Sequence, residues 1–150
     1  MHSRLITSYV FVFAAYLLWY PAAHAADESG AKAVIAKFLG SQKLDQGASA
    51  SEAQHVIADL NGDGKPDIVL MWNVLGPTWH LPRLTLFIDQ GKNYRTLTTD
   101  LIGQTEKLTV NGSNIVVDTL MPGPNDARCC PTKKTQMRFQ WTANKLVMLK

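Results

Sequence analysis

The stretch DIVLMWNVL, residues 67–75, carries apolar side chains at both alternating sets of positions. The two sets are Ile68, Leu70, Trp72 and Val74, and Val69, Met71 and Leu75. Because successive side chains of a strand point to opposite faces of a sheet, this pattern predicts a central strand that is covered on both sides. The rest of the chain must therefore supply a cover for each face.

An amphipathic helix before this strand is the expected cover for one face. In SGAKAVIAKFLG, Ser29 is a candidate N-cap and Gly40 a candidate C-terminal stop. The apolar residues between them recur at helical spacing and are Ala31, Val34, Ile35, Phe38 and Leu39. Residues 41–53 are small and polar and are predicted to form a linker.

From residue 54 onward, short apolar segments alternate with turn signals. Asn111-Gly112 predicts a hairpin with a type I′ turn, which needs positive φ at both central residues. Near the C-terminus, the apolar Met137, Phe139 and Trp141 alternate with polar residues, which predicts one buried and one solvated face. The predicted fold class is α+β: a mainly antiparallel sheet of about seven or eight short strands with one N-terminal amphipathic helix.

Residues 1–25 are predicted to be a signal peptide and residues 26–150 a single α+β domain. The first segment has a basic start at Arg4, an uncharged apolar stretch, and Ala23 and Ala25 in A-x-A order. An uncleaved membrane anchor is the competing interpretation, because about 20 apolar residues can span a bilayer. Pro21 and the A-x-A order favour cleavage, so we expect a periplasmic or secreted chain with no membrane span after cleavage. No cysteine lies near this junction, which disfavours a lipid-anchored form.

The charge of the chain is unevenly distributed. Six basic residues and no acidic residue follow Asp126: Arg128, Lys133, Lys134, Arg138, Lys145 and Lys150. One interpretation is that these cations cover the solvent face of a terminal hairpin; the other is a basic patch for an anionic envelope polymer or an acidic envelope protein. Nucleic acid is not an expected partner of an exported chain.

The segment DLNGDGKPD, residues 59–67, has the residue types of a calcium loop. Calcium binds six to eight oxygens, and tight loops supply them from acidic or amide side chains at alternate positions. The spacing matches the first nine positions of an EF-hand loop, but Leu70 replaces the expected glutamate and the flanks are strands. The alternative is an Asx-rich loop without an ion, in which the aspartates accept hydrogen bonds from nearby amides.

The longer stretch VIADLNGDGKPDIVLMW resembles the strand-loop-strand calcium loops of FG-GAP and VCBS-type repeats, which occur in integrin-like propellers. The resemblance covers about twenty residues around Asp59 to Asp67 and rests on their Asp-x-Asn-x-Asp-Gly-x-x-Asp order. It implies a structural calcium ion, with ligands from Asp59, Asn61, Asp63, the Lys65 carbonyl and Asp67. The chain has one copy of the loop and no internal repeat, so the resemblance does not extend to a propeller.

Two adjacent cysteines, Cys129 and Cys130, lie in PGPNDARCCPTKK. In an oxidising compartment they are expected to react, and a disulfide between the two would stiffen the loop. Intermolecular disulfides are an alternative, and so is a reduced pair that binds copper(I) or another thiophilic metal. The order of the acidic loop, DARCCP and a terminal MRFQWTANKLV hairpin is similar to a pattern in small bacterial envelope proteins and lipoproteins.

The segment GPTWHLPR offers Trp79, His80 and Arg83 as candidate ligand contacts on a predicted loop. The alternative is a packed tryptophan beside a solvated histidine. The sequence contains no arrangement typical of a catalytic triad or a zinc hydrolase, and no catalytic residue is predicted. We therefore expect a non-enzymatic exported binding or structural module with a calcium-stabilised hairpin. The alternatives are a thiol or soft-metal protein acting through its cysteines, and a periplasmic inhibitor or immunity-type protein.

Overall fold

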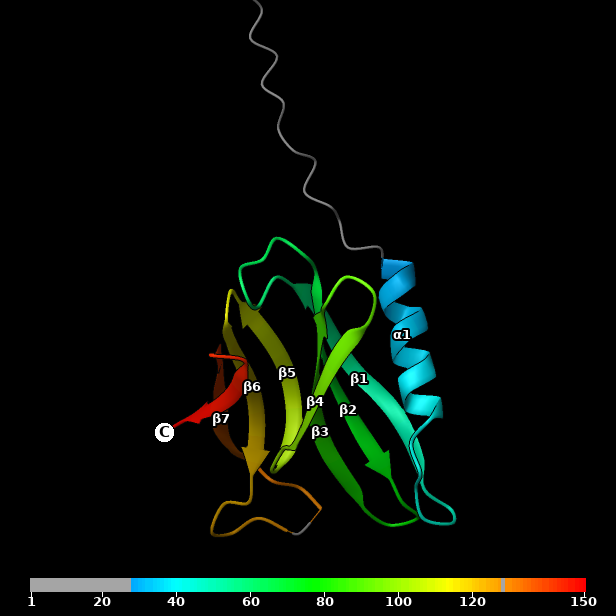
Figure 1. Cartoon of the computed structure of the whole chain (residues 1–150). Helices are drawn as coiled ribbons and strands as arrows, with labels where there is room; N and C mark the ends of the chain where they lie inside the picture. Colours follow the sequence, from blue (N-terminus) through cyan, green and yellow to red (C-terminus); the bar gives the residue numbers. More distant parts are fainter. Residues whose placement is uncertain (1–27, 128) are drawn as a thin grey trace, which may run out of the picture.

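The computed structural model describes residues 28–127 and 129–150, in which one helix is followed by eight strands (Figure 1). The predicted signal peptide, residues 1–25, lies outside the described residues. The helix is α1 (Glu28–Gly40), and the strands are β1 (Ser49–Ala58), β2 (Asp67–Leu75), β3 (His80–Asp89), β4 (Tyr94–Asp100), β5 (Gln104–Asn111), β6 (Asn114–Met121), β7 (Lys133–Thr142) and β8 (Lys145–Leu149).

The strands form two antiparallel sheets of four, each in simple chain order. Sheet A runs from β1 to β4, and sheet B runs from β5 to β8. The predicted α+β class is therefore confirmed, with the strands divided between two sheets.

Strand β2 lies between β1 and β3 and is covered on both faces, as its sequence predicts. The side chains that pack under α1 are Ile68, Leu70, Trp72 and Val74, which meet Ala31 and Ile35 of the helix. On the opposite face, Val69 and Met71 lie in the core between the sheets. Burial of one such leucine or isoleucine side chain contributes about 1.5–3 kcal/mol. Leu75 is the exception: it lies at the end of the strand and is 39% exposed.

The second hydrophobic core joins sheet A to sheet B. It is formed by buried side chains of β2, β3, β5, β6 and β7, together with Leu60 and Leu101 from connecting segments. Met137, Phe139 and Trp141 are all buried in it, which confirms the alternation predicted for β7. The protein thus has three layers: α1, sheet A and sheet B.

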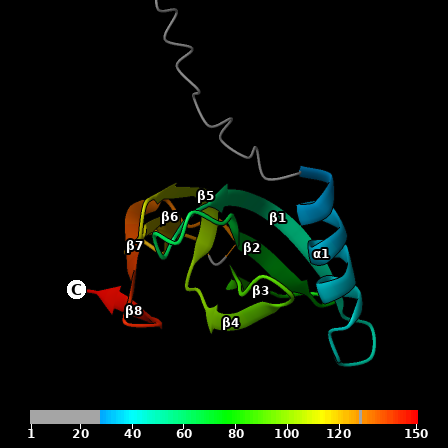
Figure 2. The ribbon, with the colours of Figure 1, turned by 45° about the horizontal axis from the view of Figure 1, so that its top comes forward.

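A side-chain amide links the sheets where β1 runs beside β5 (Figure 2). β5 is an edge strand of sheet B, so one row of its main-chain groups has no neighbouring strand in that sheet. Gln54 of β1 donates from Nε2 to the Leu108 carbonyl at 3.1 Å and accepts from the Leu108 N–H at 2.8 Å. The register of β1 against β2 shifts between Glu52 and Gln54, so that Gln54 pairs with Met71. Paired residues point to the same face of a sheet, and Met71 points into the core between the sheets, so Gln54 also points toward sheet B.

Two hairpin turns differ from the sequence prediction in detail. The β5–β6 hairpin forms, but Asn111 pairs with Asn114, so the turn residues are Gly112 and Ser113. Only Gly112 of these has positive φ, so the predicted type I′ turn centred on Asn111-Gly112 is wrong. The β7–β8 turn instead has positive φ at both central residues, Ala143 and Asn144.

The predicted linker, residues 41–53, is shorter than expected, because β1 begins at Ser49. Residues 49–52 are small or polar and have weak strand propensity, but they pair with β2 from Leu75 to Trp72. Pairing with a strongly apolar central strand therefore outweighs local propensity in this segment.

We predict that Gln54→Ala lowers the free energy of unfolding by about 1–3 kcal/mol, because both main-chain groups of Leu108 lose their partner. Urea denaturation measures the change. Gln104→Ala, an exposed glutamine at the start of β5, is the matched control and should cost less than about 0.5 kcal/mol. Equal losses for the two variants would contradict the proposed link.

Candidate functional site

The acidic loop connects β1 to β2 and is held by hydrogen bonds to its own main chain. Asp59 accepts hydrogen bonds from the N–H groups of Gly62 at 2.7 Å, Asp63 at 3.2 Å and Gly64 at 2.9 Å. Partial desolvation raises the pKa of Asp59, but these hydrogen bonds outweigh it and the net pKa is lowered. Gly62 and Gly64 have φ of 76° and 80°, which lets the chain turn around the carboxylate.

Asn61 and Asp63 continue this pattern at the tip of the loop. The Asn61 side-chain oxygen accepts from the Asp63 N–H at 2.9 Å, and Asp63 accepts from the Lys65 N–H at 2.9 Å. The Asn61 amide also donates to the second Asp63 oxygen at 3.2 Å. The first two are side-chain to main-chain contacts typical of Asx turns, and the third joins two side chains.

Asp67 is fully buried and acts as a junction between two connections. One oxygen accepts from the Leu60 N–H at 2.9 Å, and the other accepts from the Asp89 N–H at 2.8 Å. Desolvation raises the pKa of Asp67, and the nearby Asp63 and Asp59 add to this, while the two amide hydrogen bonds oppose it. The carboxylate therefore ties the start of the acidic loop to the end of β3.

A calcium ion needs six to eight oxygens directed at one point. The side-chain oxygens of Asp59, Asn61 and Asp63 are directed at loop amides, and both oxygens of Asp67 are buried against amides. In the part of the chain that the structure describes, no group of three acidic, histidine or cysteine side chains is placed to hold a metal ion. These amide contacts are those of an Asx-rich loop, and calcium binding stays a prediction.

We predict that Asp67→Ala lowers the free energy of unfolding by about 2–5 kcal/mol, since the buried Leu60 N–H and the part-buried Asp89 N–H lose their acceptor. A structural role predicts the same loss in calcium and in chelator, whereas a ligand role predicts a loss only in calcium. Thermal or urea unfolding in both buffers separates the two roles. Asp45→Ala, an exposed carboxylate in the preceding loop, is the control and should change stability little in either buffer.

His55 links β1 to the start of the helix. Its Nε2 lies 3.1 Å from an oxygen of Glu28 in α1, and its Nδ1 contacts an oxygen of Glu52 in β1. Its side chain is 11% exposed. Burial lowers the pKa of His55, but the two carboxylates outweigh it and the net pKa is raised. Glu28 also pairs with Lys32 at 3.2 Å, so the helix start carries a small charge network.

We predict a pH-dependent loss of stability from this contact. Because the folded-state pKa of His55 is raised, its contribution is complete below the ordinary histidine pKa of about 6.5 and is lost as pH rises through the folded value. The free energy of unfolding, measured by urea denaturation from pH 6 upward, should therefore fall more steeply in the natural protein than in His55→Gln. Parallel pH profiles would contradict the prediction.

Trp79, His80 and Arg83 lie at and after the β2–β3 connection and have separate surroundings. Trp79 packs closely on Gly76, where an added Cβ would overlap the indole ring, and is 41% exposed. His80 is exposed at the first position of β3. Arg83 donates from Nε to Asp100 at 3.0 Å, and its guanidinium carbon lies 5.5 Å from the centre of the Trp72 ring. Arg83 is thus engaged within sheet A, and the ligand role of the three residues stays a prediction.

The two cysteines lie in the loop between β6 and β7, where they form a disulfide between neighbouring residues. Both are exposed to solvent. The loop is closed by Asp126, which accepts from the Gly123 N–H at 2.7 Å and from the Thr132 N–H at 2.7 Å and hydroxyl at 2.9 Å. These hydrogen bonds lower the pKa of Asp126. The loop therefore has a polar clamp that does not involve the sulfur atoms.

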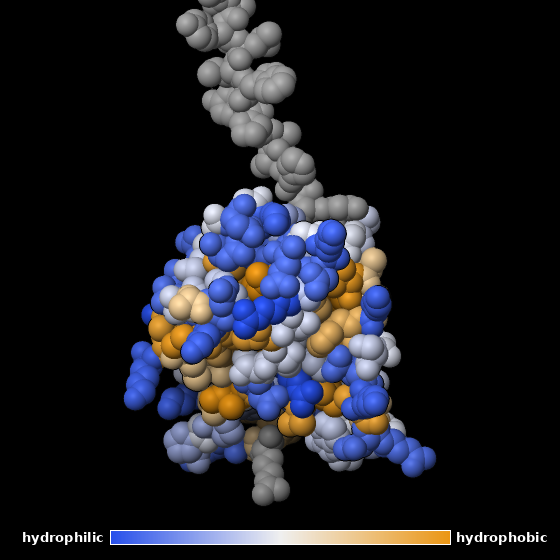
Figure 3. All heavy atoms as spheres, viewed as in Figure 1, coloured by the Kyte–Doolittle hydropathy of each residue, from blue (hydrophilic) through white to orange (hydrophobic). Residues whose placement is uncertain are grey.

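Sheet B has a feature that the sequence patterns did not reveal: its last strand, β8, is an edge strand with exposed apolar residues. Val147, Met148 and Leu149 are 41%, 55% and 40% exposed. Figure 3 shows hydrophobic side chains at the surface on the side where β7 and β8 lie in Figure 1. The successive apolar residues of KLVML are the sequence feature that could have indicated an exposed apolar strand. Only the strand order shows that no described strand pairs with the outer side of β8.

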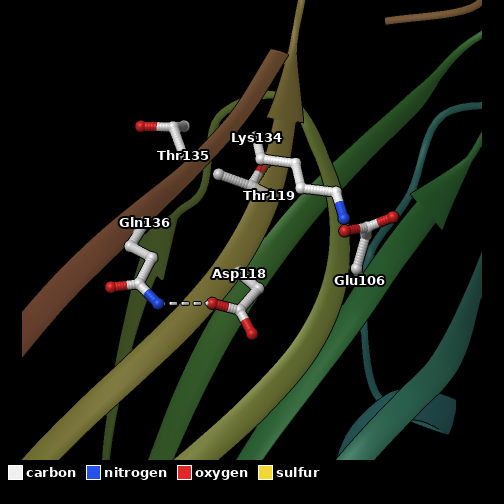
Figure 4. A pocket seen from close by; sticks show the side chains of 6 residues that line it. All are labelled: Glu106, Asp118, Thr119, Lys134, Thr135 and Gln136. Carbon is white, nitrogen blue, oxygen red and sulfur yellow. Dashed lines mark hydrogen bonds between the residues drawn. The ribbon is translucent and has the colours of Figure 1, made fainter. Parts of the chain in front are cut away.

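Two shallow pockets lie beside these elements. One, of about 300 Å³, lies between the edges β4 and β8 and includes Leu97, Leu146 and Met148 in its lining. The other, also about 300 Å³, crosses β5, β6 and β7 (Figure 4). There Gln136 donates to Asp118 at 2.8 Å, and the side chains of Lys134 and Glu106 point toward one another. The second pocket thus has charges of both signs, whereas the first is partly apolar and opens beside β8.

Comparison with protein families identifies the broader group. The LppP/LprE lipoprotein family matches residues 65–144, more than half of the chain. The chain belongs to the LppP/LprE lipoprotein family. Membership indicates an exported envelope protein, which confirms the prediction at that level. No curated protein and no solved structure matches the chain.

The LppP/LprE match corrects the resemblance to FG-GAP and VCBS-type repeats, which was wrong. The match begins at Lys65, so it excludes Asp59, Asn61 and Asp63. A short acidic loop between two strands needs only closely spaced aspartates and glycines, and unrelated hairpins can share that chemistry.

Among the described residues, no helix is long and apolar enough to cross a membrane.

Proposed function

We propose that this envelope protein is a non-enzymatic binding module that holds an extended acidic segment of another envelope protein along β8. The observation that carries the proposal is the combination of an open sheet edge, exposed apolar side chains and surrounding cations. Each part of that combination comes from sheet B, while sheet A has its outer face packed against α1.

The first support is the shape of the edge. An edge strand presents main-chain N–H and C=O groups that an added strand can pair with, and alternate side chains of the added strand then contact the sheet. Val147 lies opposite Gln140 and Leu149 lies opposite Arg138, so these side chains share the outer face of sheet B. Met148 lies opposite Phe139 and lines the pocket beside β4. An added strand would therefore find apolar contacts on both faces of the edge.

The second support is charge. Lys145 begins β8, Lys150 follows its last residue, and Arg138 lies beside it in β7. Within the described part of the chain, none of these three cations takes part in an ion pair. Antiparallel pairing of KLVMLK with a second copy would place Lys145 opposite Lys150, and like charges disfavour that pairing. An acidic partner strand would instead place opposite charges beside these lysines.

A calcium ion in the acidic loop would have a structural role in this binding module. Asp59 and Asp63 raise the pKa of the buried Asp67, which reflects unfavourable proximity of three carboxylates. A calcium ion would reduce that repulsion and stabilise the β1–β2 hairpin. Its role would be to support sheet A.

An inhibitor or immunity-type protein would use the same β8 surface with an enzyme as its partner.

A synthetic peptide of alternating valine and glutamate tests the binding mode. We predict that it protects the amides of β8 from hydrogen exchange, and that binding weakens as salt is raised because the contacts are partly ionic. Leu149→Glu should weaken binding about tenfold, since it removes an apolar contact and adds a like charge. NMR titration of the folded protein measures both effects.

Ile102→Glu is the matched control, because Ile102 is a similarly exposed aliphatic residue, 52% exposed, outside β8. It should leave the peptide affinity unchanged. Dextran sulfate provides an anionic polymer without a backbone that can join a sheet. Binding of dextran sulfate with no protection of β8 by the peptide would overturn the proposal in favour of a polymer, and self-association through β8 would overturn it in favour of a second copy.

A further inference from the structure

We infer that the Cys129–Cys130 bridge is a reversible redox site whose reduced form binds a soft, thiophilic cation of the copper(I) class. This inference goes beyond the proposed binding module, because it concerns a different loop and a different ligand. It rests on the exposure of both sulfur-bearing residues, on the way the loop is closed and on the ligand types that remain available.

Exposure makes the bridge accessible to exchange. Both cysteines lie on the surface of the β6–β7 loop, and the described residues contain no free cysteine that could compete with them. Thiol–disulfide exchange requires a thiolate to reach one of the bridged sulfur atoms, so an exposed bridge can react where a buried one cannot. Lys133 and Lys134 begin β7 a few residues later and supply positive charge near the loop. Positive charge favours the thiolate form of a reduced cysteine.

The loop is built to keep its shape when the bridge opens. Asp126 joins Gly123 to Thr132 across the loop, and the Cys130 N–H donates to the Ala127 carbonyl at 3.0 Å. Strands β6 and β7 pair directly up to Met121 and Lys133 at the two ends of the loop. The bridge itself spans only neighbouring residues, so it closes almost no chain that these contacts leave open. Reduction should therefore change the chemistry of the loop more than its fold.

The exchange step balances with a dithiol as the reductant. A thiolate of the dithiol attacks one bridged sulfur, the Cys129–Cys130 bond breaks, and a mixed disulfide forms. The second thiol of the reductant then closes its own disulfide and releases the protein as a dithiol. Two electrons and two protons pass from the reductant to the protein, and the reductant leaves as a cyclic disulfide.

The reduced pair offers two sulfur ligands on neighbouring residues, with Cα atoms 3.8 Å apart. Thiolates select soft cations such as copper(I) over hard cations such as calcium and magnesium. The carboxylate of this loop, Asp126, already accepts hydrogen bonds on both oxygens. The cysteine sulfur atoms are therefore the side-chain groups of the loop that we expect to bind a metal ion. Binding of copper(I) would displace the thiol protons to water, with no change in the oxidation state of the metal.

The first test reduces the folded protein with dithiothreitol without denaturant, then traps thiols with iodoacetamide and measures intact mass. We expect an unmodified monomer before reduction and a doubly alkylated monomer after it. The melting temperature should differ little between the two forms, because the Asp126 clamp remains. A bridge that opens only in denaturant, or a reduced form that unfolds, would overturn the redox site.

The second test titrates copper(I) against a chromophoric copper(I) chelator under anaerobic conditions. The reduced protein should withdraw one copper(I) per chain, the oxidised protein none, and Cys130→Ser should lose the ability to compete. Thr132→Val is the matched control, since it removes the hydroxyl contacts to both Asp126 oxygens but keeps both cysteines, and it should still bind copper(I). Equal competition by the natural protein and Cys130→Ser, or no binding by the reduced protein, would overturn the metal site.

Discussion

The burial of both faces of β2 is the constraint on which the other layers depend. Its two sets of apolar side chains cannot both be hidden by one neighbouring element, because they project in opposite directions. Helix α1 covers one set and sheet B covers the other. The order of layers, and the need for a second sheet, follow from this single strand.

Polar side chains in or beside the core have hydrogen-bond partners. Asp67 is buried at the start of β2 and accepts hydrogen bonds from two main-chain amides, and Gln54 forms both hydrogen bonds to Leu108 between the two sheets. Among the described residues, no buried side-chain nitrogen or oxygen lacks a partner. The same chemistry shapes the acidic loop, where carboxylates turn toward main-chain N–H groups. That loop is consequently a scaffold element whose oxygens stabilise the chain around them.

The two sheets differ in what they leave open. Sheet A is packed on both faces of its central strand, and Arg83, Trp72 and Asp100 form contacts within it. Sheet B has the exposed edge β8, cations beside it that form no ion pair with the described residues, and the cysteine loop at the connection of β6 to β7. Both proposed activities therefore use sheet B, and sheet A with α1 packs behind it. The two surfaces are separate, so partner binding and copper(I) binding can be measured independently.

The sequence by itself determined the helix, the central position of β2 and the alternation in β7, because the spacing of apolar residues reports which faces are buried. It also determined the exported class, because the N-terminal segment has the composition of a secretory signal. The local motif at residues 59–67 was a weaker guide. It suggested calcium ligands and an unrelated family, whereas in the folded loop the side-chain oxygens of Asp59, Asn61 and Asp63 accept hydrogen bonds from main-chain amides. Only the tertiary structure decided that the strands form two sheets, that Gln54 meets Leu108 and that β8 is an edge. These features depend on residues far apart in the chain, and a local pattern cannot state which strand has no neighbour.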